Sequence, residues 1–248
     1  MLKVRIIPIL TFNGFSLVKT KNFSNPRIIG NPVQAARLYN SRRVDELVFI
    51  DIFASTQKRK INLKLVTNVL KECFMPVTVG GGITSIEDIN DLLKIGADKV
   101  IIKSKALSSP EFINEAVSFF GSQCISIAVD AYKSPEGYKI FNNLNINISL
   151  EDFINQMIVC NVGEFIVTSI DNEGIMQGFD IELTNQIQKL TKIPIVVSGG
   201  GGEMKHYTDL FSMTTIQAVG SSSIFHFSQF TPLDIKNTLK SNGIPVRI

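Results

Sequence analysis

The chain is poor in the residues that build metal centres and disulfide frameworks. Its 248 residues hold two histidines, His206 and His226, and three cysteines, Cys73, Cys124 and Cys160, which are too far apart for a CxxC motif. Neither histidine is spaced with cysteines or carboxylates as metal ligands usually are, so we expect no metal and no cofactor. The odd number of cysteines and the lack of a signal peptide favour the reducing cytoplasm.

Long apolar runs, strong charge and nucleotide-binding motifs are also missing. The apolar stretches are far shorter than a membrane span, so we expect no membrane association. With 25 basic and 22 acidic residues the net charge is +3, too small to indicate nucleic-acid binding. Neither GxGxxG nor GxxxxGK[ST] occurs, which argues against dinucleotide and P-loop sites. A hydrophobic fraction of 44% is enough for one large core.

The most informative feature that is present is an internal repeat. ELVFIDIFAST, which begins at Glu46, resembles EFIVTSIDNEG, which begins at Glu164; the offset is 118 (164 − 46). PVTVGGGI, which begins at Pro76, resembles PIVVSGGGG, which begins at Pro194, at the same offset. A repeat on this scale predicts two structurally equivalent halves.

Apolar, β-branched runs alternate with helical segments eight times. We expect strands at Val4–Leu10, Leu47–Ile52, Val77–Val79, Lys99–Ile102, Ile125–Val129, Phe165–Thr168, Ile195–Val197 and Ile216–Val219. We expect helices near 32–42, 60–72, 86–95, 109–119, 150–160, 181–191, 203–211 and 232–241. Alternating strands and helices predict a parallel sheet. Eight units with twofold self-similarity predict a closed (β/α)8 TIM barrel, a fold of about 250 residues, as one domain over 1–248. The long connection 11–31 is typical of a functional or mobile loop.

Polar turns follow four of these strands, where the active site of such a barrel lies. They are Gly80–Gly82, Lys103–Ser104, Gly199–Gly202 and Gly220–Ser223. Glycine turns and helix N-termini present backbone N–H groups that bind phosphate, although one such turn could be merely a tight connection. The repeat offset of 118 sets Ser222 opposite Ser104. This duplication favours a substrate with a phosphate at each end.

Charged side chains lie at both ends of the expected strands. Asp130 ends the fifth strand, where a carboxylate can transfer protons, and Thr11 ends the first. Asp51 and Asp171 face the same end, as substrate ligands or as loop caps. A second set starts four strands and would form a ring at the opposite end, either a neutralised plug or a gate into the barrel: Arg5, Glu46, Lys99 and Glu164.

Several motifs together resemble one known family. They are RIIP, DELVFIDI, PVTVGGGI, GADKV, FGSQ, GEFIVTSIDNEG, IPIVVSGGGG and the closing VRI, and they span nearly the whole chain. The chain resembles the cyclase subunit of imidazole glycerol phosphate synthase, a TIM-barrel lyase of histidine biosynthesis. That subunit takes ammonia from a glutaminase subunit docked at the barrel bottom, through a charged gate. The ammonia reacts at the mouth with a bisphosphate ribulosyl aminoimidazole carboxamide intermediate.

The resemblance implies roles for individual residues. Catalysis falls to Asp130 and to Thr11, which occupies the position of a second aspartate. Substrate and phosphate binding fall to Lys19, Asp51, Gly82, Lys103, Ser104, Asp171, Gly174, Gly200, Ser221 and Ser222. The ammonia gate would be Arg5, Glu46, Lys99 and Glu164, and the glutaminase would dock at Asp98 and Gln123 to form a heterodimer.

The chain departs from the family pattern at the mouth. Thr11 replaces an aspartate, Lys103-Ser104 replaces Asn-Thr, and Glu173 replaces an aspartate. These departures favour an alternative: a diverged paralogue that delivers ammonia for amidino-sugar and surface polysaccharide biosynthesis. Two further readings stay open. A sister isomerase barrel shares the phosphate sites but needs no gate, and an inactive scaffold could only activate a glutaminase.

Overall fold

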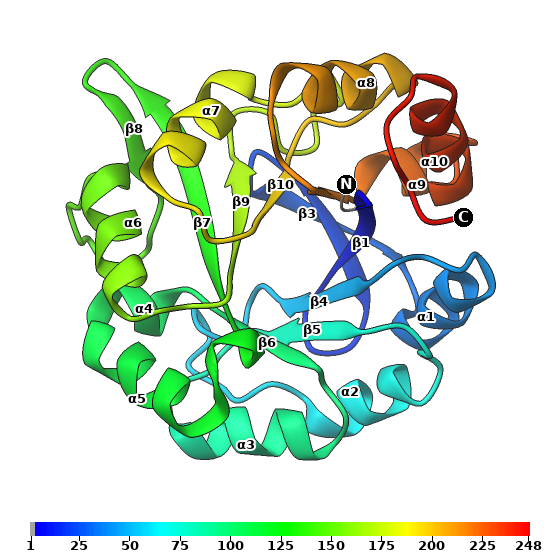
Figure 1. Ribbon diagram of the computed structural model, residues 1–248. Helices are drawn as coiled ribbons and strands as arrows, with labels where there is room; N and C mark the ends of the chain where they lie inside the picture. Colours follow the sequence, from blue (N-terminus) through cyan, green and yellow to red (C-terminus); the bar gives the residue numbers. More distant parts are fainter. Residues whose placement is uncertain (1–2) are drawn as a thin grey trace.

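The computed structural model describes residues 3–248. Eight parallel strands form the barrel, because apolar runs alternate along the chain with helices that cover them. These strands are β1 (Arg5–Phe12), β4 (Leu47–Asp51), β5 (Val77–Gly80), β6 (Lys99–Ile102), β7 (Ile125–Ser134), β9 (Glu164–Ser169), β10 (Ile195–Ser198) and β11 (Ala218–Ser221). Pairing of β11 with β1 closes the sheet (Figure 1). The predicted TIM barrel is confirmed.

Helices surround the strands on the outside (Figure 1). They are α1 (Pro32–Ser41), α2 (Leu63–Leu70), α3 (Ile86–Lys94), α4 (Ser104–Ser108), α5 (Pro110–Phe120), α6 (Leu150–Val159), α7 (Ile181–Leu190), α8 (Met204–Met213), α9 (Ser223–Phe227) and α10 (Pro232–Ser241), with a 3-10 turn, η1, at Ser122–Cys124. Side-chain caps start several of them, as Ser85 does for α3 and Thr231 for α10. Within residues 3–248, no helix is long and apolar enough to cross a membrane.

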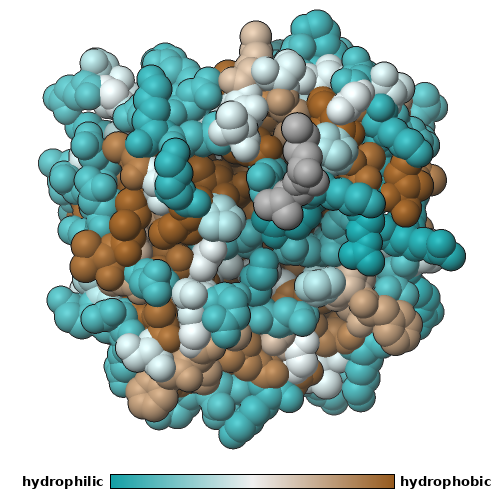
Figure 2. Space-filling view, viewed as in Figure 1, coloured by the Kyte–Doolittle hydropathy of each residue, from teal (hydrophilic) through white to brown (hydrophobic). Residues whose placement is uncertain are grey.

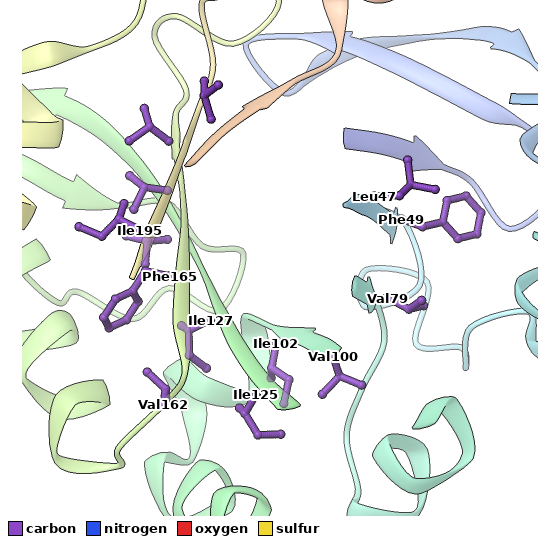
Figure 3. Close-up of a cluster of buried hydrophobic side chains, with 14 of the residues drawn as sticks. Leu47, Phe49, Val79, Val100, Ile102, Ile125, Ile127, Val162, Phe165 and Ile195 are labelled. Carbon is purple, nitrogen blue, oxygen red and sulfur yellow. The ribbon is translucent and has the colours of Figure 1, made fainter. Parts of the chain in front are cut away.

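Two cores hold the barrel together. The larger lies between strands and helices; its side chains, such as Phe49, Val79 and Phe165, point away from the barrel axis (Figure 3). The smaller fills the barrel interior with Ile7, Ile9, Val48, Ile101, Ile166, Val196 and Ala218. Neighbouring residues on a strand thus alternate between the two cores, as in a closed barrel.

Two antiparallel additions extend from the strand ends. The long connection 11–31, expected to be a loop, contains a hairpin of β2 (Leu17–Lys21) and β3 (Ser24–Gly30). In the second half β7 continues to Ser134 and pairs with β8 (Gly137–Ile140). Both hairpins lie beside the C-terminal ends of the barrel strands, where the polar turns also gather.

The twofold repeat continues into the two shortest helices. Lys103 precedes α4 and Ser222 precedes α9, with nearly equal backbone angles: φ −129° and ψ −72° at Lys103, φ −134° and ψ −67° at Ser222. The expected pairing of Ser222 with Ser104 is therefore wrong by one residue. The connection into β11 is one residue longer than its counterpart (218 − 194 is 24, whereas 99 − 76 is 23). The structural partner of Ser104 is Ser223.

Candidate functional site

A cavity of about 400 Å³ opens at the C-terminal ends of the barrel strands. It collects residues from both halves of the chain, and nearly all the predicted mouth residues line it. These are Thr11, Lys19, Asp51, Gly82, Lys103, Ser104, Asp130, Gly174, Gly200, Ser221 and Ser222. Asp171 lies outside the cavity, where its carboxylate accepts the N–H of Lys133 at 2.7 Å.

Two glycine turns form opposite walls of the cavity. Gly81 (φ +115°) and Gly200 (φ +112°) have backbone conformations that side chains rarely adopt. A Cβ atom at Gly81 would lie 2.3 Å from the carbonyl oxygen of Asp51, and one at Gly200 would lie 1.9 Å from that of Gly178. Only glycine fits at these positions, so the turns can bring their backbone N–H groups close to a bound anion.

Serines from the β6 and β11 ends lie beside these turns. Ser221 is buried, and its hydroxyl pairs with that of Tyr207 at 2.7 Å. Ser223, which the sequence motifs place in the turn after the eighth strand without a role of its own, also lines the cavity and is 6% exposed. Its position as the repeat partner of Ser104 is the signal that would have found it. The two halves therefore each offer a glycine turn and a hydroxyl to the same cavity.

Each of three carboxylates around the cavity contacts a cation. Asp51 holds Arg59 through two bonds of 2.6 and 2.9 Å. Asp51 also accepts the N–H groups of Phe53 and Ala54, so its oxygens already bind the loop after β4. The geometry of the Asp51 carboxylate fits the role of a loop cap more closely than that of a free substrate ligand.

The second pair joins the predicted catalytic aspartate to a lysine. Lys103 Nζ lies 2.5 Å from an oxygen of Asp130. The same ammonium lies 5.7 Å from the ring centre of Phe23 and 5.1 Å from that of Phe141, both within cation–π range. Phe23 comes from the β2–β3 hairpin and Phe141 follows β8, so Lys103 ties both hairpins to Asp130. The sequence could not reveal this contact, because the four residues are far apart in the chain.

The third pair is Lys19 with Glu173, both buried in the cavity wall. Burial lowers the pKa of the Lys19 ammonium to about 8. His226 lies nearby, and burial, helped by the charge of Lys19, lowers the pKa of its imidazole to about 4. The imidazole is therefore neutral at physiological pH, and Lys19 is the cation of this wall.

Thr11 lies in the cavity but its hydroxyl is engaged. Its Oγ1 donates to the carbonyl of Val18 at 2.6 Å, which fixes the entry to the β2–β3 hairpin. A threonine hydroxyl has no acidic proton to exchange at neutral pH. Asp130 is thus the carboxylate of the predicted catalytic pair, and Thr11 contributes a neutral group in place of a second one.

The four predicted gate residues form a closed ring at the opposite end of the barrel. Arg5 bonds Glu46 at 2.7 Å and Glu164 at 2.8 Å. Lys99 reaches the same two carboxylates at 3.3 and 3.1 Å, so each cation bridges both acids. Burial opposes the charge of Arg5, but Glu164 and Glu46 outweigh it and raise the pKa of the guanidinium. The ring closes the barrel floor with charge balanced inside it.

The molecule's face around this ring is mixed in character (Figure 2). Asp98 and Gln123 are exposed here, beside the starts of β6 and β7. Phe74, on the connection after α2, and Phe119 and Met213, at the C-terminal ends of α5 and α8, are 89%, 68% and 62% exposed. Apolar side chains around a polar centre are typical of a protein-binding face.

Comparison with known proteins places these features in a family. Residues 5–231 match the family described as "Histidine biosynthesis protein". The chain is 39% identical over 251 residues to the imidazole glycerol phosphate synthase subunit HisF of Streptococcus mutans, with 100% of both chains covered. It is 42% identical over 252 residues to HisF of Staphylococcus carnosus, with 100% of this chain and 99% of that one covered.

These matches cover the whole chain, so the matched region includes the barrel strands, both glycine turns and the ring. HisF of Clostridium botulinum adds 36% identity over 253 residues, again with 100% of both chains covered. The chain belongs to the HisF-type family of imidazole glycerol phosphate synthase subunits.

Proposed function

We propose that this protein is the ammonia-using synthase subunit that forms imidazole glycerol phosphate in histidine biosynthesis. The observation that supports the proposal is full-length similarity to HisF subunits combined with a barrel that has a cavity lined by glycine turns and serines at one end and a charged ring at the other. The protein would act as a single domain in the cytoplasm, with a HisH-type glutaminase as its partner in a heterodimer.

The cavity supports a substrate with a phosphate at each end. One phosphate would bind between the Gly82 turn and Ser104, the other between the Gly200 turn and the serines of β11 and α9. Lys19 supplies positive charge between the two halves. Asp130 is the group that would move protons while ammonia adds to the acceptor, and Lys103 holds its carboxylate in place.

The ring supports the arrival of ammonia from below. Neutral ammonia is small and can pass a narrow polar constriction that excludes ions. The exposed face around the ring, with Asp98 and Gln123, would receive the glutaminase. Ammonia released there would enter the barrel without mixing with bulk solvent.

The test uses purified protein, the bisphosphate acceptor and ammonium salts, without a partner. We expect imidazole glycerol phosphate to form, because free ammonia can enter at the mouth. Adding a HisH-type glutaminase and glutamine should then support the same reaction. Product formation in neither assay would contradict the proposal, and glutaminase activation without synthase turnover would identify an inactive scaffold.

A second candidate function is ammonia delivery to another acceptor, as in amidino-sugar biosynthesis. Two features favour this second function. Thr11 stands where a second carboxylate would exchange protons, and Lys103 pairs with the carboxylate of Asp130. Under this reading the bisphosphate acceptor would turn over poorly while glutamine hydrolysis in the complex stays intact. Efficient turnover of that acceptor would exclude it.

A further inference from the structure

Ser126 carries a buried hydroxyl that the protein leaves unpaired. The residue lies on β7 and is 0% exposed. Among residues 3–248, no group forms a hydrogen bond with its Oγ. Buried polar groups are nearly always hydrogen-bonded, and alanine would pack as well at a strand position with no bond to make. The unpaired hydroxyl therefore indicates that a polar ligand binds here.

The position of Ser126 is fixed by its strand neighbours. It is the register partner of Glu164 on β9, a member of the ring, and of Ile101 on β6. Two residues further along its own strand, on the same face, lies Ala128. Ala128 and Ile101 line the cavity. Ser126 consequently lies inside the barrel, beside the Glu164 side of the ring and below the cavity floor.

The surroundings of Ser126 favour a small neutral ligand over an ion. The interior core here is apolar, so an ion would lose its hydration without compensation. At a rise of about 3.3 Å per residue, Ser126 lies roughly 13 Å below Asp130. Ala128 is small and leaves room above the hydroxyl. Thr78, buried and in register with Lys99, adds a second hydroxyl residue at the same end of the interior.

We propose that the Ser126 hydroxyl is a binding point for ammonia on its way from the ring to the cavity. Ammonia has three N–H donors and one lone pair, and a serine hydroxyl can accept one donor and donate to the lone pair. Ser126 is a positioning residue, since it takes no part in bond formation. The inference rests on the proposed function and adds a specific contact inside the barrel.

The test compares glutamine-supported with ammonium-supported turnover in the complex with a HisH-type glutaminase. Ser126→Val replaces the hydroxyl with a methyl group and adds a second methyl group, which narrows the interior. Ser126→Ala removes the hydroxyl alone. We expect Ser126→Val to lower the glutamine-supported rate about tenfold or more, and Ser126→Ala to lower it less, because the smaller side chain leaves the space open. The ammonium-supported rate should stay within about twofold, since that ammonia enters at the mouth.

Thr184→Val is the matched control. Thr184 is a buried hydroxyl residue of α7, outside the barrel interior, and it donates to the carbonyl of Asp180 at 2.7 Å. It should leave the ratio of the two rates unchanged. Equal loss in both assays for the Ser126 variants, or no loss in either, would overturn the inference. A wild-type complex inactive in both assays would refute the proposed function, and the ammonia assignment with it.

Discussion

At the scale of single residues, the mouth of the barrel differs from a site with two free carboxylates. Asp130 is paired with Lys103, and Thr11 donates its only proton to the Val18 carbonyl. Losing one acid–base group typically lowers a rate by about 10²–10⁴. We therefore expect Thr11 and Lys103 to be the positions that limit turnover in this chain.

The first prediction concerns Thr11→Asp. Restoring a carboxylate should raise kcat for imidazole glycerol phosphate formation in the ammonium assay, by about tenfold or more if the site otherwise fits. The new carboxylate would also face the Val18 carbonyl, which has lost its donor. We expect the gain to be larger in Thr11→Asp/Lys103→Asn, where Asp130 is released as well. A lower kcat in both variants would show that Thr11 is not the limiting residue.

The second prediction concerns pH. Because the pKa of Lys19 is lowered to about 8, its positive charge disappears as pH rises through that value. KM for the anionic acceptor should then increase above about pH 8, because only about a tenth of the Lys19 side chains stay charged one pH unit above that pKa. Lys19→Arg keeps its charge to above about pH 12, so its KM should stay flat. The measurement holds free ammonia constant; identical profiles for both proteins would rule out Lys19 as the cause.

At the scale of elements, the sequence predicted the barrel strands well because each is a short apolar run bounded by polar turns. The hairpin β2–β3 was missed because β3 is almost wholly exposed and neither strand is a continuous apolar run. The extension of β7 and its pairing with β8 were missed for the same reason, because a strand that leaves the barrel no longer shows the continuous apolar run of a barrel strand.

The third prediction tests a glycine turn. Gly200→Ala would place Cβ 1.9 Å from the Gly178 carbonyl oxygen and must displace the turn. Loss of one charge-assisted bond to phosphate costs about 1.5–3 kcal/mol, so KM for the acceptor should rise about tenfold or more. Gly96→Ala is the control: φ there is +108° but no atom lies within 4 Å of the added Cβ. A similar KM in both variants would argue against the turn as a phosphate site.

At the scale of the whole molecule, a buried ion pair connects the last helix to the segment before β4. Lys236 of α10 bonds Asp45 at 2.8 Å, with side chains 4% and 6% exposed. The other oxygen of Asp45 accepts the N–H of Ile6 on β1 at 2.9 Å. The pair thus joins the last helix to the first strand, next to the seam where β1 and β11 close the barrel.

The fourth prediction follows from this burial. Lys236→Ala leaves the Asp45 charge buried and unpaired, which should lower the free energy of unfolding by about 3–5 kcal/mol. Lys205→Ala breaks an exposed pair with Asp209 and should cost at most about 1 kcal/mol. Urea unfolding measures both. Equal effects would mean that the buried pair contributes no more than a surface one.

The sequence predicts those residues of the candidate site that lie at the ends of barrel strands, because the strand ends themselves can be predicted. The ring residues could be grouped because Arg5, Lys99 and Glu164 begin barrel strands and Glu46 directly precedes one. The glycine turns could be grouped because each follows a strand. Side-chain pairing was not predictable, since the partners of Asp130 and Asp51 depend on rotamers and loop paths. The unpaired hydroxyl of Ser126 could not be seen either, because its burial depends on the closed barrel.

The passage of ammonia through the ring is tested by the effect of Lys99→Glu on two assays of the same complex. The change sets three acids against Arg5 in the ring and should disrupt it. We expect glutamine-supported turnover to fall about tenfold or more, while ammonium-supported turnover stays within about twofold of wild type. Equal loss in both assays would show that the ring is a structural plug and that ammonia does not pass through this barrel.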